Sequence, residues 1–224
     1  MKVISHKKEL GSGIYTIPDI SRLLNIDRRK VNRYISEYWD ERMGRKLFRD
    51  TYSWSTDKRN KAVNFYVLIE LYTFFQLQEK GVNTKTILKA RNEIAEDLNV
   101  EYPFATAGLL TDGKRIWYEF KDVIVNADGS SQTNFVKIIQ SFAEKIEFRD
   151  NDLAKRFWPA GKDSSVVIDP HHQFGQPVIK GTNITAQALF SMYRSGEPME
   201  AIGVLYDISV KELTDAINFY RQAA

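Results

Sequence analysis

The sequence predicts an α+β fold that is mainly helical. Apolar residues at helical spacing fill the N-terminal third, alternating apolar and polar residues follow in the middle, and three short helical patterns come after two strand-like runs. The chain of 224 residues is long enough for several small domains. We expect a helical N-terminal domain at 1–100, a small β-rich connecting region at 101–160 and a C-terminal helical domain with two short strands at 161–224.

A short first helix is predicted over Ile17–Leu24. Thr16 is a suitable N-cap and Pro18 falls in the first turn. Ile20 extends the apolar face that begins at Ile17. Asn25 follows the helix, and asparagine tolerates the left-handed conformation of a tight turn. The segment therefore predicts a helix that ends in a sharp turn.

Asp27 is a good N-cap for a second helix, predicted over residues 28–39. A short helix, a tight turn and a basic second helix form the pattern of a helix-turn-helix, which places its second helix in the major groove of DNA. The alternative interpretation is an ordinary helical hairpin with a charged outer face.

Residues 42–54 combine Gly44 with basic and aromatic residues at strand-like spacing, which predicts a wing beside the helix pair. Arginine recognises guanine, asparagine recognises adenine, and basic residues on a loop contact phosphates. The sequence thus predicts a winged helix-turn-helix that binds double-stranded DNA. The expected DNA-binding residues are Arg28, Arg29, Lys30, Asn32, Arg33, Tyr34, Arg45, Lys46 and Arg49.

Two core helices are expected next, one from Lys61 to about Lys80 and one that starts near Asn83 or Thr84. Residues 13–95 as a whole resemble MerR-like winged helix-turn-helix regulators, in which the second helix and the wing touch DNA. Asn25 stands where that family usually has glycine, and the chain has no cysteine for metal sensing. The resemblance rests on Tyr15–Ser21, Val31–Tyr34, Thr51–Ser55 and Glu79–Val82.

The middle region is expected to contain β structure over Phe104–Val125 with a turn at Asp112–Gly113. A helix over residues 134–144 and a strand over 145–148 follow. Trp117 and Trp158 are either core residues or aromatic anchors at a protein interface.

The C-terminal third begins with two short strands within residues 165–184, around a turn with glycine and proline. Helices are predicted over 185–194, 198–206 and 210–222, the last capped by Ser209 together with Glu212. This helix-turn-helix-like trio has a weakly basic outer face, and we do not expect it to read DNA. The two short strands either serve only the fold of this domain or pair with those of a second copy across a two-fold axis, which would make the protein a homodimer.

Residues 155–222 resemble a bacterial domain-of-unknown-function family (four-three-three), on the strength of Asp169–Pro170, Gly175–Thr182 and Ile184. That family includes VapB-like antitoxins, which are typically encoded beside toxins with a PIN-like nuclease fold. Asn183 and Asp207 stand where the family usually has arginine and proline. The resemblance implies a cognate PIN-like toxin as partner. The expected partner-binding residues are Arg149, Lys155, Arg156, Phe157 and Trp158.

Composition excludes several classes of protein. The chain has no cysteine, only three histidines and no apolar run long enough for a membrane span, so we expect a cytoplasmic protein without disulfides, metal or cofactor. His171 and His172 are the one cluster that suggests metal chemistry, and adjacent histidines are a poor ligand pair. No catalytic residues are recognisable, so we do not expect an enzyme.

Charge is distributed unevenly: residues 1–64 carry a net charge of +7 and residues 65–224 carry −4. A basic N-terminal third favours one surface for a polyanion and another for a different partner. The sequence therefore predicts a type II antitoxin that binds its own operator DNA and neutralises the toxin by direct binding. The alternatives are a MerR-like regulator that responds to a small-molecule effector, with no toxin partner, and a DNA-organising protein.

Overall fold

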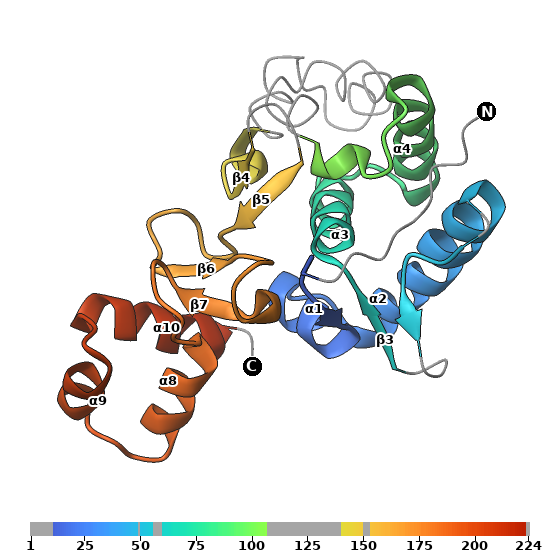
Figure 1. Cartoon of the computed structure of the whole chain (residues 1–224). Coiled ribbons are helices and arrows are strands. Elements are labelled where there is room, and N and C mark those ends of the chain that lie inside the picture. The colour runs from blue at the N-terminus through green and yellow to red at the C-terminus, as the bar shows by residue number, and fades with distance from the viewer. Residues whose placement is uncertain (1–10, 49, 56–59, 107–139, 150–152, 223–224) are drawn as a thin grey trace.

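The computed structural model describes residues 11–48, 50–55, 60–106, 140–149 and 153–222 (Figure 1). Helices surround small antiparallel sheets, and the predicted α+β fold class is confirmed. None of the helices in the described ranges has the length and apolar character needed to cross a bilayer. The expected turn at Asp112–Gly113, Trp117 and most of the helix over 134–144 lie outside these ranges.

The first two helices begin where the sequence predicts, and the first also ends there. Strand β1 (Tyr15–Thr16) leads into α1 (Ile17–Leu24), and Thr16 and Asp19 form a reciprocal capping box. Asn25 ends α1 in the left-handed conformation, with φ of 53°. Helix α2 (Arg28–Tyr34) then starts behind Asp27, which accepts hydrogen bonds from two backbone N–H groups. The arrangement of α1, the turn and α2 is thus fixed by local capping.

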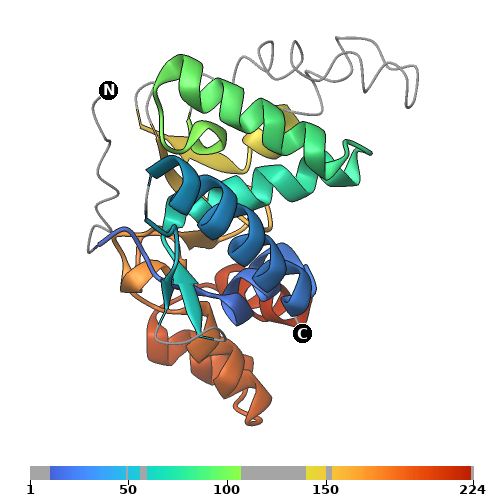
Figure 2. The same ribbon diagram turned by 90° about the vertical axis from the view of Figure 1, so that its right-hand side faces the viewer.

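The second helix is longer than predicted. Helix α2 passes directly into the π-helix η1 (Ile35–Phe48), and the two form one continuous rod (Figure 2). Ile35, Trp39 and Met43 are buried at a spacing of four, so one apolar face continues along the rod. The expectation of an extended wing that begins at Arg42 is therefore wrong over residues 42–48.

Gly44 shows why that prediction failed. A Cβ atom at Gly44 would collide with the backbone carbonyl oxygen of Asp50. The glycine thus allows the chain to fold back closely against the helix, instead of forming a turn.

A hairpin does follow the long helix, but further along the chain. Strands β2 (Trp54–Ser55) and β3 (Lys61–Val63) are antiparallel and pair Trp54 with Ala62, and β1 adds to the other edge of β3. The strand at 61–63 corrects the prediction that a helix begins at Lys61. The antiparallel pair of β2 and β3 thus lies further along the chain than the predicted wing.

Helices α3 (Phe65–Glu79) and α4 (Thr84–Leu98) form the centre of the N-terminal part. The side chains of Asn64 and Asn83 cap them by accepting hydrogen bonds from the third backbone N–H of each helix. Eleven of the fifteen residues of α3 are buried, because the helix is covered on several sides.

One buried ion pair joins these helices. Glu70 of α3 and Arg91 of α4 are both inaccessible to solvent, and Arg91 Nη2 lies 2.7 Å from Glu70 Oε2. The same carboxylate accepts hydrogen bonds from Trp39 Nε1 at 3.1 Å and from the backbone N–H of Phe104 at 3.2 Å. Burial raises the pKa of Glu70, and these donors act against that rise.

Phe104 itself belongs to a 3-10 helix, η2 (Pro103–Ala105), so the predicted β structure does not begin there. A four-stranded antiparallel sheet follows, in the order β4-β5-β6-β7. It crosses residue 160, the predicted boundary between the middle and C-terminal regions. Its strands are β4 (Ile146–Phe148), β5 (Ala154–Phe157), β6 (Val166–Ile168) and β7 (Pro177–Ile179).

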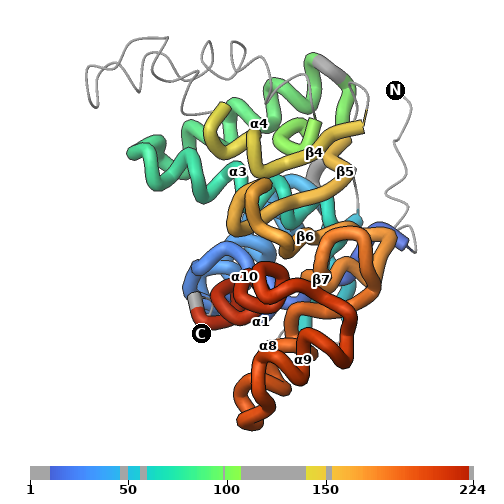
Figure 3. Tube along the Cα trace, turned by 90° about the vertical axis from the view of Figure 1, so that its left-hand side faces the viewer, coloured from blue at the N-terminus to red at the C-terminus, as the bar shows by residue number. Residues whose placement is uncertain are grey.

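The C-terminal helices are α8 (Ala186–Arg194), α9 (Met199–Tyr206) and α10 (Val210–Gln222). They share a second apolar core with β6 and β7, and Ser209 and Glu212 form the predicted capping box. Helix α10 lies beside α1, where the Arg22 guanidinium is 5.7 Å from the centre of the Tyr220 ring (Figure 3). The C-terminal helices therefore pack directly on the helix-turn-helix.

We predict that Glu70→Gln destabilises the protein by about 3–5 kcal/mol, because it leaves the Arg91 charge buried without its counter-charge. The matched control is Glu93→Gln, which breaks an exposed pair with Lys89 on α4 and should cost less than about 1 kcal/mol. Urea unfolding followed by circular dichroism measures both, and an equal loss in the two variants would contradict the central role of this pair.

Candidate nucleic-acid interface

The turn between α1 and α2 is held by its own backbone and side chains. Ser21 Oγ donates to the carbonyl oxygen of Ile26 at 2.6 Å, and the N–H of Ile26 donates to the carbonyl oxygen of Ser21 at 3.0 Å. A polar hollow of about 300 Å³ surrounds this turn and reaches Arg22, Asn25 and Arg28. The start of α2 therefore has a fixed orientation relative to α1 and lies beside the polar hollow.

Three arginines of the second helix face solvent. Arg28, Arg29 and Arg33 are exposed, and within the part of the chain that the structure describes no ion pair engages them. Arg33 lies over the ring of Tyr34, with 5.3 Å between the guanidinium carbon and the ring centre. Arginines free of carboxylates at the N-terminal half of such a helix are suited to base edges and phosphates.

Lys30 and Asn32 are less exposed than the three arginines. Lys30 is half-buried, with its ammonium group 5.0 Å from the centre of the Phe75 ring. The side-chain oxygen of Asn32 is buried and has no hydrogen-bond partner among the described residues. We interpret Lys30 as a packing residue at the edge of the helix, and Asn32 stays a predicted DNA contact.

The structure places Tyr34 in the core instead of on the outer face. Its ring is only 4% exposed, and its hydroxyl oxygen accepts a hydrogen bond from Gln78 and lies 3.1 Å from the Thr84 hydroxyl. Burial tends to raise the pKa of Tyr34, but the bonds to Thr84 and Gln78 and the nearby Lys30 outweigh it and lower the pKa. Tyr34 thus connects α2 with α3 and α4.

The remaining predicted contacts follow the long helix. Arg45 is exposed in η1 and pairs with Glu41 one turn earlier, at 2.7 Å. The side chain of Lys46, and all of Arg49, lie outside the described residues. Since residues 42–48 are helical, Arg45 extends the basic surface of the second helix and is not part of the hairpin.

Sequence reasoning missed a buried aspartate that supports the hairpin. Asp40 of η1 accepts hydrogen bonds from the N–H and the hydroxyl of Ser53 at 2.9 and 2.8 Å, and from Lys61 Nζ at 2.5 Å. These bonds tie β2 and β3 to the long helix. An aspartate among charged neighbours gives no sequence signal of burial, so this role is visible only in the structure.

Two of the expected partner-binding residues are internal. Phe157 is buried with its ring 4.8 Å from that of Tyr72, and Trp158 is 4% exposed beside Val167 and Val178. Of the two interpretations of Trp158, the core residue is therefore correct. Burial removes both rings from the surface that a partner could reach.

The three charged members of that set lie near the sheet and the loop after β6. Arg149 Nη2 lies 2.8 Å from His171 Nε2, Lys155 pairs with Glu147 at 3.3 Å, and Arg156 Nε donates to Asp169 Oδ2 at 2.8 Å. Arg149 and Arg156 thus reach the segment after β6, whereas Lys155 pairs within the sheet.

Asp169 is the acidic centre of this group. Burial acts to raise its pKa, but the hydrogen bonds from Arg156 and from the backbone N–H of His171 prevail and lower the pKa of Asp169. His172 Nδ1 also lies 3.3 Å from the carboxylate. Across the described ranges, no three histidine, aspartate or glutamate side chains gather in a way that could hold a metal ion.

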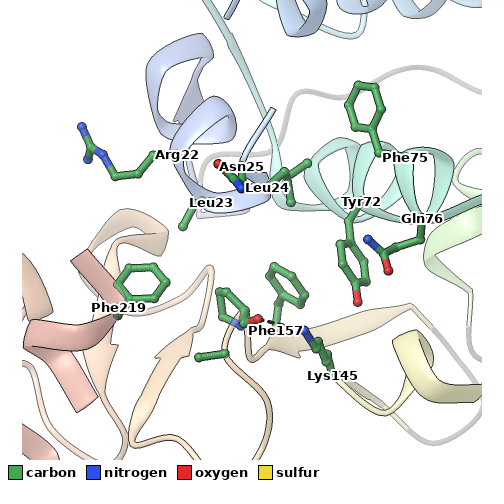
Figure 4. A pocket seen from close by; sticks show the side chains of 12 residues that line it. Arg22, Leu23, Leu24, Asn25, Tyr72, Phe75, Gln76, Lys145, Phe157 and Phe219 are labelled. Atoms are coloured by element: carbon green, nitrogen blue, oxygen red, sulfur yellow. Dashed lines mark hydrogen bonds between the residues drawn. The ribbon is translucent and has the colours of Figure 1, made fainter. Parts of the chain in front are cut away.

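A cavity of about 220 Å³ separates the helix-turn-helix from the sheet (Figure 4). Leu23 and Leu24 at the end of α1, Tyr72 of α3, Phe157 of β5 and Phe219 of α10 contribute apolar walls. The Lys145 ammonium group donates to the carbonyl oxygen of Pro159 at 3.2 Å on the same side. The hollow is thus lined by a mixture of apolar, aromatic and polar groups.

A family model described as "Protein of unknown function (DUF433)" matches residues 166–220. The chain is 25% identical to the Mycobacterium tuberculosis protein named "Putative antitoxin VapB45" over 167 residues, which are 69% of this chain and 70% of that protein. It is also similar to the crystal structure of Rv2018 from Mycobacterium tuberculosis, with a TM-score of 0.69 and 20% identity over 91% of this chain and 96% of that one.

The match at 166–220 confirms the family resemblance inferred for the C-terminal part. The similarity to a protein named as an antitoxin supports a VapB-like antitoxin. The likeness to the solved structure shows the fold. The MerR-like character of the N-terminal part stays a prediction.

We predict that Asp169→Asn lowers stability by about 1–2 kcal/mol at pH 7, because Arg156 loses its charged acceptor. The pKa of Asp169 is lower in the folded protein than in the unfolded chain, so this stabilisation is present above the unfolded pKa near 3.9 and is lost as the pH falls through the folded value. The difference in the free energy of unfolding between the variant and the parent should therefore disappear at acidic pH. Urea titrations from pH 7 to pH 3, with the exposed Glu200→Gln as control, test this; a gap that is constant with pH would contradict it.

Proposed function

We propose that the chain is a DNA-binding antitoxin of a type II toxin–antitoxin pair. Helix α2 binds the operator of its own gene, and other surfaces hold a toxin with a PIN-like nuclease fold. The observation that carries the DNA-binding part is the set of exposed arginines at positions 28, 29 and 33 on α2, which form no ion pair with any other described residue. The protein is proposed to act without catalysis of its own.

The geometry supports major-groove binding in two ways. The capped turn and the buried Tyr34 hold α2 firmly on the core, so the exposed arginines project from a rigid helix. The hairpin is fixed to the same helix through Asp40, which places a second element beside the first. We further propose a homodimer, because two copies would match two half-sites of an operator.

The antitoxin part rests on similarity. The chain resembles a protein named as a VapB-type antitoxin over 69% of its length, and the family match lies in the C-terminal part, away from α2. An antitoxin that also binds its operator needs one surface for DNA and another for the toxin. The uneven charge, +7 over residues 1–64 and −4 over the rest, fits such a division.

We predict that Arg29→Ala weakens operator binding by about 1–3 kcal/mol and relaxes sequence preference at one position of the site. Fluorescence anisotropy with the DNA upstream of the protein's own gene, against a scrambled duplex at two salt concentrations, measures this. The parent protein should prefer the upstream DNA by about a thousandfold or more.

Arg194→Ala is the matched control, since it removes an exposed arginine from α8 in the C-terminal part. It should leave affinity for DNA unchanged. If Arg29→Ala and Asn32→Ala bind as the parent does, the assignment of α2 fails. Equal, salt-sensitive binding of both duplexes would indicate a DNA-organising protein instead.

The toxin is tested directly with the product of the gene adjacent to this one. We predict that the purified product cleaves RNA alone and that an equimolar amount of this chain suppresses cleavage and forms a stable complex in size-exclusion chromatography. If the product of the adjacent gene has no nuclease activity, or if this chain neither binds nor inhibits it, the result counts against the antitoxin assignment.

The cavity of about 220 Å³ between α1 and the sheet favours a second candidate, a regulator that responds to a small-molecule effector without a toxin. The cavity touches the end of α1, so a ligand there would contact the helix that supports α2. A rise in melting temperature with a small aromatic molecule, together with changed DNA affinity, would support this alternative.

A further inference from the structure

The turn after β6 has an unusual backbone. Gln173, Phe174 and Gly175, which form the short helix η3, have successive φ angles of 47°, 55° and 85°. Glycine adopts such angles freely, but a bulky side chain with positive φ is a genuine outlier and is strained. The strain at Phe174 must therefore be imposed by its surroundings.

Those surroundings hold the turn from several sides. The N–H of Gly175 donates to the carbonyl oxygen of His172 at 2.8 Å, and the carbonyl oxygen of Phe174 accepts from the N–H of Ile14 at 3.0 Å. Gly175 itself packs against Tyr15, where a Cβ atom would overlap the tyrosine hydroxyl. Two segments far apart in the sequence thus fix the conformation of the turn.

The ring of Phe174 contributes little buried surface to the fold. It is 77% exposed, and the neighbouring Ile14 is 47% exposed. Asparagine or glycine would satisfy the left-handed backbone at this position with less strain. The structure therefore holds a large aromatic side chain in water at an energetic cost, which is the pattern of a residue kept for an external contact.

The turn that carries Phe174 also carries polar side chains, and a cationic side chain reaches it from the segment between β4 and β5. His171 and His172 belong to the same turn, and Arg149 reaches it through its 2.8 Å contact with His171. The nearby carboxylate of Asp169 is already occupied by Arg156 and by the N–H of His171. A partner surface that receives Phe174 is therefore best matched by an apolar hollow edged with carboxylates.

We propose that Phe174 and its turn are the docking point for the toxin, with Phe174 in an apolar hollow and Arg149 opposite acidic groups of the toxin. This inference rests on the proposed function. It places the protein contact on the turn of residues 171–175 and leaves the arginines of α2 for DNA.

The test uses Phe174→Gly and Phe174→Asn in the full chain. Each variant should melt at or above the temperature of the parent, because the backbone strain is relieved. Affinity for the purified product of the adjacent gene, measured by isothermal titration calorimetry, should fall by about 30-fold or more, as for an interface hot spot. Leu205→Ala, an exposed apolar residue of α9, is the matched control and should bind as the parent does.

The outcomes separate the two claims. If the parent binds the toxin and the Phe174 variants bind it equally well, the docking point is wrong and the antitoxin assignment stands. Variants that melt well below the parent would show that the ring serves the fold, which also overturns the proposal. If the parent itself binds no toxin, the proposed function fails and this inference fails with it. If Arg149→Ala binds the toxin as tightly as the parent does, the proposal that Arg149 lies opposite acidic groups of the toxin is wrong.

Discussion

The fold of the N-terminal part depends on the buried carboxylate of Glu70. Its oxygens accept hydrogen bonds from Arg91 on α4, from the Trp39 indole on η1 and from the backbone N–H of Phe104 in η2. Arg91 in turn donates to the carbonyl oxygen of Glu101 at 2.8 Å. A buried ion pair adds little net stability compared with apolar packing, but it tolerates few alternative arrangements, because each unmet partner would remain charged or polar in the core. The pair therefore fixes how the elements meet more than it holds them together.

This constraint reaches the candidate interface through the long helix. Trp39 lies on the rod that begins with α2, so the bond from its indole to Glu70 fixes the rotation of the rod about its own axis. Tyr34, one turn earlier, is held between Thr84 and Gln78. With the inner face fixed at two points, the opposite face, which carries Arg28, Arg29 and Arg33, is fixed too. The hydrogen bonds from Ser53 and Lys61 to Asp40 fix the position of the hairpin relative to the same rod.

Local signals in the sequence predicted much of this arrangement. Thr16, Asp27 and Ser209 begin helices as expected, because an N-cap is recognised from a few adjacent residues. The length of the second helix was not predictable in this way, since Gly44 looks like a turn residue unless one sees the backbone of Asp50 beside it. The burial of Asp40, Glu70 and Arg91 was equally hidden, because a charged residue is by default a surface residue. For the site, the exposure of the arginines of α2 is predictable from the sequence. Tyr34 and Phe157, predicted as contacts, lie in the core, as does Trp158, for which a core position is one of the two sequence interpretations.

The strained turn and the helix-turn-helix belong to one packed unit, although the sequence separates them widely. Ile14 is hydrogen-bonded to Phe174, Tyr15 fills the space against Gly175, and the next residue, Thr16, caps α1. Tyr15 is buried so deeply that its hydroxyl has no partner among the described residues, and burial raises the pKa of that hydroxyl well above its ordinary value. A buried tyrosine with an unmet hydroxyl is costly, and the contact it makes is therefore a packing contact that holds the turn and the start of α1 together. A cut between the N- and C-terminal parts would expose both sides of this contact, so the two surfaces are better understood as features of a single folded body than as properties of separable domains.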